Sequence, residues 1–131
     1  MKRPTGLAAR GDRAGLVARP LVVALIAAGV VSPTTAATIN VTTGGDTSSM
    51  SSCTLRDAIA SINGAALLNG CSIASGLFGT DDTVDLTGQA GTIGLTGGTL
   101  MPTAPVRLQG PGASTLTISG LGAVRLIDTT A

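Results

Sequence analysis

Three acidic side chains that lie close together in the chain are the first candidates for chemistry. Asp81, Asp82 and Asp85 could offer carboxylate oxygens to calcium, which binds about six to eight oxygen ligands. The alternating acids, the Gly and the closing Glu of an EF-hand calcium loop are absent, and the chain contains no Glu. The favoured interpretation is therefore a solvated acidic turn, with a calcium site as the alternative.

Residue types that are missing restrict other chemistry. The 131 residues include no His, no Trp, no Tyr and one Phe. Without His, the Ser-His-Asp and Cys-His nucleophiles and every His-ligated metal site are excluded. We therefore predict that the chain is not an enzyme and has neither catalytic residues nor a cofactor.

The two cysteines predict a structural bond rather than redox chemistry. Cys53 and Cys71 lie 18 residues apart and lack the CxxC spacing of redox-active dithiols. In an exported protein, an oxidising compartment would join them in a disulfide. Closing a loop of this length stabilises a fold by about 3 kcal/mol in the chain-entropy account.

Residues 1–37 have the order of a secretory signal peptide. Five Lys or Arg residues against one Asp give this segment a charge of +4, and an apolar run of 11 residues follows at 21–31. Ser32-Pro33 and small residues come next, so cleavage after Ala36 or after Ala37 fits equally well. A transmembrane anchor is the alternative, but a spanning helix needs roughly 20 apolar residues. We expect export by the general secretory route to the cell surface or the medium.

The composition of the chain after the leader does not favour binding to nucleic acid or membranes. Residues 38–131 carry three Arg against six Asp and no Lys, so their net charge is −3. Phosphate-backbone binding therefore has no electrostatic support, and one aromatic ring makes no stacking platform. We expect no nucleic-acid partner and no stable membrane span after cleavage. Surface glycans and proteins stay open as partner classes.

A strand, a loop and a helix are predicted to position the first cysteine. Residues 38–43 alternate apolar and polar side chains as a half-buried strand does, and residues 44–52 are turn-forming. Over 53–64 the period changes to that of a helix, with one apolar stripe made by Leu55, Ala58, Ile59 and Ile62.

The ends of this predicted helix are also marked in the sequence. Thr54 is the expected N-cap with Asp57 three residues on, and Asn63-Gly64 is the expected stop. Arg56 lies opposite the apolar stripe. We interpret it as a solvated surface residue, with a tether to neighbouring loop carbonyls as the alternative.

A short unit, apolar-x-apolar-x-Gly, recurs from residue 83 onward. Four complete units begin at Val84, Ile93, Val106 and Leu116. Alternate units are 22 or 23 residues apart, which is the spacing of a solenoid with two short strands per period. This pattern favours a parallel β-helix over a β-sandwich.

The same repeat predicts an ion pair on the outside of the coils. Asp85 and Arg107 occupy the polar middle position of alternate units, where neighbouring parallel strands lie about 4.8 Å apart. We therefore expect Asp85 to pair with Arg107, as a surface contact and not as catalytic machinery.

The start of the predicted helix resembles a known family motif. The run Cys53-Thr-Leu-Arg-Asp-Ala-Ile59 resembles the Cys-Ser-Leu-Arg-Glu-Ala motif of the CSLREA domain, with Thr54 in place of Ser and Asp57 in place of Glu. The resemblance spans about residues 38–120. The matching residues are Cys53, Thr54, Leu55, Arg56, Asp57, Ala58, Ile59 and Asn63. It implies the N-terminal part of an exported, right-handed parallel β-helix protein of the pectin-lyase-like type, a group usually without assigned activity.

Together these features predict a mainly β fold with one short N-terminal helix. We expect a cleaved signal peptide over 1–37, a capping segment over 38–82 and incomplete β-helix coils over 83–131. Because about two coils are present, we expect a fragment of a longer chain. The expected function is non-catalytic adhesion or display. The alternative is the leading end of a polysaccharide lyase or hydrolase whose catalytic coils are missing, with the acidic cluster and Arg107 in the lyase roles.

Overall fold

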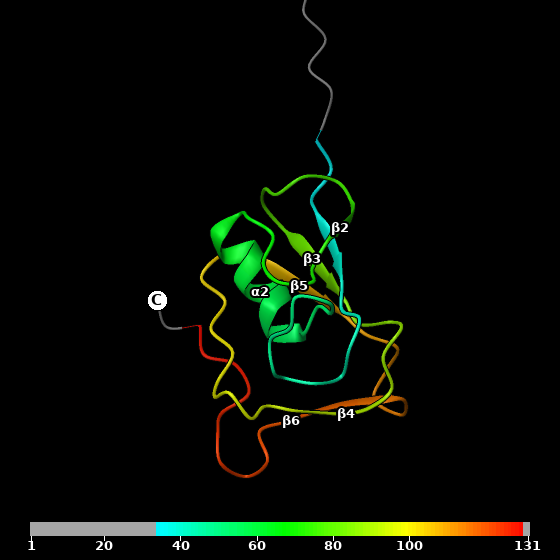
Figure 1. Cartoon of the computed structure of the whole chain (residues 1–131), viewed down its shortest axis with the longest axis vertical. Coiled ribbons are helices and arrows are strands. Elements are labelled where there is room, and N and C mark those ends of the chain that lie inside the picture. The colour runs from blue at the N-terminus through cyan, green and yellow to red at the C-terminus, as the bar shows by residue number, and fades with distance from the viewer. Residues whose placement is uncertain (1–33, 130–131) are drawn as a thin grey trace, which may run out of the picture. The chain divides into compact units, whose positions relative to one another are not determined.

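The computed structural model describes residues 34–129, so the predicted leader up to Pro33 lies outside the described residues. Six strands form two separate sheets, and a single helix lies beside them in the described part of the chain (Figure 1). The elements are β1 (Thr38–Asn40), α2 (Leu55–Gly64), β2 (Ile73–Ser75), β3 (Asp82–Asp85), β4 (Gly91–Gly94), β5 (Val106–Gln109) and β6 (Leu116–Ser119).

The first sheet has the strand order β2-β1-β3-β5, and the second contains β4 and β6. β1 pairs with β3 and β3 pairs with β5 in parallel, whereas β2 runs antiparallel to β1 at the edge. β4 and β6 also run parallel. The repeat therefore predicted correctly that alternate units pair with each other. β3 spans the predicted boundary at residue 82 and contacts strands from both sides of it.

The register of these pairs differs from the prediction by two residues. Val84 lies beside Leu108, and Ile93 lies beside Ile118, so corresponding positions of the units are not aligned. A shift of two keeps every side chain on its predicted face, because side chains alternate along a strand.

The predicted ion pair is lost through this shift. Asp85 faces Gln109, and Arg107 faces Thr83. Within residues 34–129 the ion pairs join Arg56 to Asp46 and Arg125 to Asp128 instead. The expected contact between Asp85 and Arg107 is therefore wrong.

The predicted fold class is also wrong: the chain forms a small mixed α/β structure that does not close into a solenoid. Each sheet holds only two strands from the repeat units, and the first sheet ends in the antiparallel strand β2. The apolar face of α2 shares one core with residues of both sheets. In a closed solenoid coil, an additional strand would take the place of this helix. The helix stripe supplies apolar surface that must be buried, and this requirement competes with closure of a coil.

The helix itself follows the prediction closely. Leu55, Ala58, Ile59 and Ile62 are all buried, and the Thr54 side chain caps the first turn by accepting a hydrogen bond from the Asp57 N–H at 3.0 Å. The end differs, because Ala65 takes the left-handed conformation with a φ of 49° beyond the predicted Asn63-Gly64 stop.

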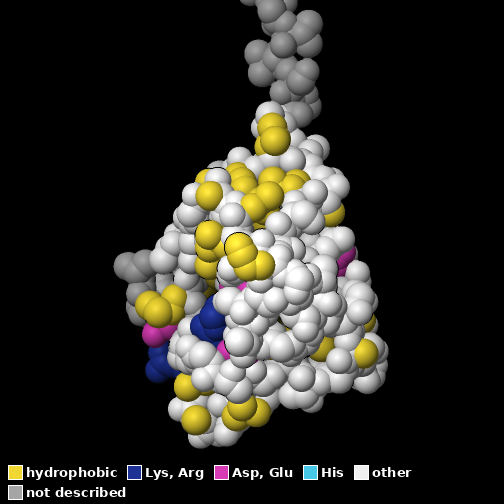
Figure 2. All heavy atoms as spheres, in the orientation of Figure 1, with side chains coloured by type: hydrophobic (Ala, Val, Ile, Leu, Met, Phe, Trp, Pro, Cys, Tyr) yellow, Lys and Arg dark blue, Asp and Glu magenta, His cyan; other side chains and the backbone are white. Residues whose placement is uncertain are grey.

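Hydrophobic side chains reach the surface in separate patches on the face that Figure 2 shows, and charged side chains there are few. The large hydrophobic residues that are more than half exposed are Met50, Leu77, Met101 and Leu121. In the described range, no helix has the length and hydrophobicity needed to cross a bilayer.

Candidate functional site

The predicted disulfide is confirmed between Cys53 and Cys71. Cys53 directly precedes the helix cap, so the bond ties the start of α2 to the loop that follows the helix. Gly70 must approach this region closely, since a Cβ at residue 70 would lie 2.2 Å from the Ser52 nitrogen. The disulfide and the glycine together hold two polar loops against each other.

Asp57 is the centre of a polar network beneath the helix start. Its carboxylate accepts hydrogen bonds from the Ser48 hydroxyl at 2.6 Å, the Thr54 hydroxyl at 2.8 Å and the Asn69 amide at 2.7 Å. Burial raises the pKa of Asp57, but these hydrogen bonds together outweigh burial and hold the pKa below its usual range. The acid of the family-like motif therefore serves the scaffold as an ionised anchor.

Arg56 contacts a loop on one side and a distant segment on the other. Its guanidinium donates from Nε and Nη2 to the two carboxylate oxygens of Asp46, each at 2.9 Å. It also donates to the carbonyl oxygens of Gly98 at 2.6 Å and Thr99 at 3.3 Å. The interpretation as a solvated surface arginine is wrong, and the alternative of a tether to loop carbonyls is confirmed.

Asp46 is the partner that the sequence analysis missed. Burial raises the pKa of Asp46, but the Arg56 guanidinium and the Gly97 N–H, which donates at 2.7 Å, together lower it below its usual range. The available signal was an acidic residue in a glycine-rich turn ten residues before an arginine. Such a signal is too common to identify a partner.

Asn63 binds the same distant segment about two turns further along α2. Its side-chain nitrogen donates to the Met101 carbonyl at 2.9 Å, and its side-chain oxygen accepts from the Thr103 and Ala104 N–H groups at 2.8 and 3.3 Å. Arg56 and Asn63 thus hold residues 98–104 against the helix. Two polar residues of the motif position one wall of a groove.

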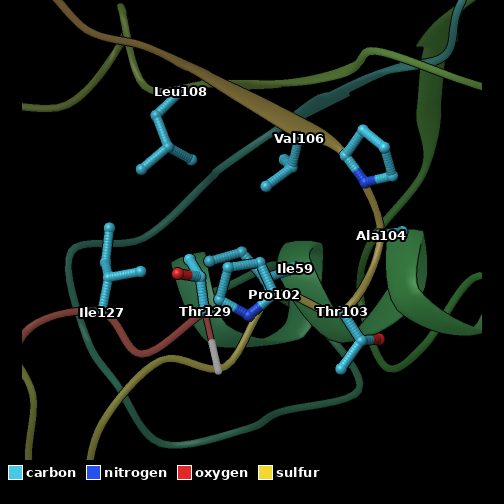
Figure 3. Close-up of a pocket in the computed structure, with 9 residues that line it drawn as sticks. Ile59, Pro102, Thr103, Ala104, Val106, Leu108, Ile127 and Thr129 are labelled. Carbon is cyan, nitrogen blue, oxygen red and sulfur yellow. The ribbon is translucent and has the colours of Figure 1, made fainter. Parts of the chain in front are cut away.

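This groove is apolar and has a volume of about 430 Å³. Figure 3 shows Val106 and Leu108 of β5 pointing toward Ile59 of α2 and Pro102, with Ile127 across the opening. The full lining consists of Ile59, Pro102, Thr103, Ala104, Pro105, Val106, Leu108, Ile127 and Thr129. Among the described residues, no charged side chain lines the groove, so they can hold an apolar group there and supply no acid, base or nucleophile beyond two threonine hydroxyls.

The interpretation of the acidic cluster as a solvated turn is wrong for one of its three carboxylates, which is buried. Asp82 is buried and accepts hydrogen bonds from the Ala37 and Gly79 N–H groups, whereas Asp85 accepts from the Thr87 N–H and Asp81 is exposed. Within residues 34–129, no three acidic or cysteine side chains come together in a way that could hold a metal ion. Asp82 and Asp85 point to opposite faces of the sheet, because side chains alternate along β3.

Comparison with protein-family models, curated proteins and solved structures finds no match for this chain. The resemblance of residues 53–59 to the CSLREA motif therefore stays a prediction from those residues. Their contacts assign them scaffold roles: Cys53 in a disulfide, Thr54 as cap, and Arg56 and Asp57 in buried or half-buried hydrogen bonds.

Proposed function

We propose that this chain is an exported, non-catalytic surface or secreted protein of the adhesion or display type. The leader-like residues 1–37 and the CSLREA-like run support export. The disulfide between Cys53 and Cys71 supports it independently, because such bonds persist in oxidising compartments and are rare in the cytosol.

The apolar groove beside β5 carries the binding part of this proposal. Its lining is aliphatic and proline-rich and has no charged side chain, so it complements apolar side chains of a protein. Sugar rings commonly stack on aromatic side chains, and the single aromatic residue, Phe78, is not part of the lining. We therefore favour a protein partner over a glycan.

The contacts of the charged residues support a role without catalysis. Arg56, Asp46 and Asp57 are engaged in hydrogen bonds that hold loops in place, and none of them lines the groove. Lyase activity by this chain's own residues would require the acidic cluster and Arg107 to converge, but Asp82 points into the core while Arg107 is exposed. No observation favours the lyase alternative.

A binding assay on the exported chain tests the proposal. We compare wild type, Ala104→Asp in the groove and Ala66→Asp on an exposed turn for binding to surfaces coated with cell-surface proteins or with deproteinised polysaccharides of the producing organism. We expect binding to the protein-coated surface, a loss of about tenfold for Ala104→Asp, and wild-type behaviour for Ala66→Asp. Equal binding by both variants would contradict the groove as the contact site.

Two further measurements separate the parts of the proposal. Cell fractionation should place the chain outside the cytoplasm with its disulfide formed, and a reduced cytoplasmic chain would contradict export. Incubation with acidic polysaccharides and calcium should give no unsaturated product. Product formation by the purified chain would overturn the non-catalytic assignment.

A further inference from the structure

The start of β1 lies against a buried carboxylate. Ala37 is fully buried, and its N–H donates to Oδ1 of Asp82 at 2.8 Å. Asp82 is 1% exposed, and the Gly79 N–H lies 3.2 Å from both of its oxygens. Within the described residues these donors are neutral backbone groups, and no Arg forms an ion pair with Asp82. A buried carboxylate is stabilised by a paired positive charge, and a cationic group at the Ala37 nitrogen would supply that charge to Asp82.

The chain is held on both sides of Ala37, by a continuous ladder on its C-terminal side and by an isolated bridge between Ala36 and Leu77 on its N-terminal side. On its C-terminal side, the Ala37 carbonyl accepts a hydrogen bond from the Thr83 N–H at 2.8 Å, and the parallel pairing of β1 with β3 begins at the next residue. On its N-terminal side, the Thr35 carbonyl accepts from the N–H of Leu77, a residue that is 62% exposed. Water can replace that outer hydrogen bond, whereas in the uncleaved chain Ala37 and Asp82 are shielded from water.

This asymmetry distinguishes the two leader cleavage positions that the sequence leaves equal. Cleavage after Ala37 would remove a hydrogen-bond donor from Asp82 and an acceptor from Thr83, and would leave both groups short of a partner. Cleavage after Ala36 would keep both contacts. It would also turn the neutral N–H at residue 37 into an ammonium group.

We propose that the leader is removed at the Ala36–Ala37 bond and that the new α-ammonium group of Ala37 forms a buried ion pair with Asp82. A membrane-bound leader peptidase adds water across the amide: the C–N bond breaks, Ala36 takes the water oxygen and leaves as a carboxylate, and the Ala37 nitrogen takes both water protons to become an ammonium group. Because Ala37 is fully buried in the folded chain, this hydrolysis precedes the folding of β1. The inference rests on the proposed export.

The ion pair has a measurable consequence. A neighbouring carboxylate favours the charged form of an amine, so Asp82 raises the pKa of the new terminal amine above its ordinary value of about 8. Burial without the charge would lower that pKa. The sequence isolates this amine, because Lys2 is the only lysine and it lies in the leader.

The first test is N-terminal sequencing and intact mass of the full chain expressed with its own leader in a secreting bacterium. We expect the mature protein to begin at Ala37. A chain that begins at Thr38 or elsewhere would overturn the inference while leaving export intact. An uncleaved chain, which would take two amine labels at Met1 and Lys2, would overturn both the inference and the proposed export.

The second test is acetylation of the terminal amine by an N-hydroxysuccinimide ester at pH 8. We expect labelling about fivefold slower in the folded mature protein than in urea, because a rise of one pKa unit from about 8 lowers the neutral fraction of the amine at pH 8 from about a half to about a tenth. Asp82→Asn should remove most of the protection while keeping the shape of the side chain. Asp85→Asn, whose wild-type carboxylate bonds to Thr87, is the control and should label as wild type does. Equal protection in Asp82→Asn would overturn the ion pair.

The pH profile of the wild-type protein decides the question if Asp82→Asn does not fold. We expect the folded protein's labelling midpoint to lie above about 9. A midpoint at or below about 8 would mean that burial alone protects the amine, and would overturn the ion pair.

Discussion

The guanidinium of Arg56 and the carboxylate of Asp46 meet in a two-point contact, with both nitrogen–oxygen distances at 2.9 Å. This geometry joins the first turn of α2 to the loop that precedes it. The same guanidinium reaches two carbonyl oxygens of the segment that walls the groove. Arg56 therefore links the helix, the loop before it and a segment more than 40 residues further along the chain.

Replacing Arg56 with lysine tests this link. A lysine ammonium cannot reproduce the planar two-point contact and also reach Gly98 and Thr99, so Arg56→Lys should lower the free energy of unfolding by about 1–3 kcal/mol. Urea denaturation measures this difference. Arg107→Lys on the exposed face of β5 is the matched control and should change stability by less than about 0.5 kcal/mol. Equal effects of the two substitutions would contradict the link.

Acid should destabilise the fold through two carboxylates. The pKa values of Asp46 and Asp57 are lowered in the folded state, so their stabilisation is complete above the ordinary aspartate pKa of about 4. The unfolded chain takes up protons first as the pH falls, and the stabilisation is lost as the pH passes down through the folded-state values. The free energy of unfolding should therefore fall below about pH 4.

The double variant Asp46→Asn, Asp57→Asn isolates this effect. Its stability at pH 7 should be lower than that of wild type, and its further loss in acid should be smaller. Denaturation curves from pH 7 to pH 3 measure both quantities. An acid loss as large as that of wild type would assign the effect to other carboxylates.

Removing the disulfide should weaken the fold without changing the helix sequence. Cys53→Ala, Cys71→Ala opens a loop of 18 residues and should lower the free energy of unfolding by about 3 kcal/mol. Chemical reduction of the wild-type protein is an independent control and should give a similar loss. A loss below about 1 kcal/mol would mean that the loops hold together without the bond.

The end of α2 offers a stabilising substitution. Ala65 adopts a φ of 49°, a conformation that costs an L-residue with a Cβ about 1–2 kcal/mol. Ala65→Gly should raise the thermal midpoint, with a gain of about 0.5–1 kcal/mol after the added chain entropy of glycine is subtracted. Ala66→Gly, next to it but without a positive φ, should give no gain. Equal gains in stability for the two substitutions would contradict backbone strain at Ala65.

Features that depend on local spacing could be predicted. The helix stripe, the Thr54 cap and the pairing of alternate repeat units follow from side-chain periodicity, and all three are found. The pairing of Cys53 with Cys71 followed because the chain has no other cysteine. Each of these predictions needs only neighbouring residues or a unique pair.

The register, the fold class and the groove could not be predicted in this way. A shift of two residues leaves side chains on the same faces, so the repeat alone could not exclude the pairing of Asp85 with Gln109. The groove takes its lining from α2, β5 and two irregular segments, which share no sequence pattern.

By itself, the sequence determined the helix, the first strand and the repeat strands, which units pair and which cysteines join, but it gave no signal for the edge strand β2. The tertiary structure alone decided that the helix face shares one core with both sheets, that Arg56 binds Asp46, and that Asp82 lies against the Ala37 nitrogen. The physical reason is one of range. Periodicity follows from local backbone geometry, whereas packing and buried polar contacts depend on how segments far apart in the chain compete for one small core.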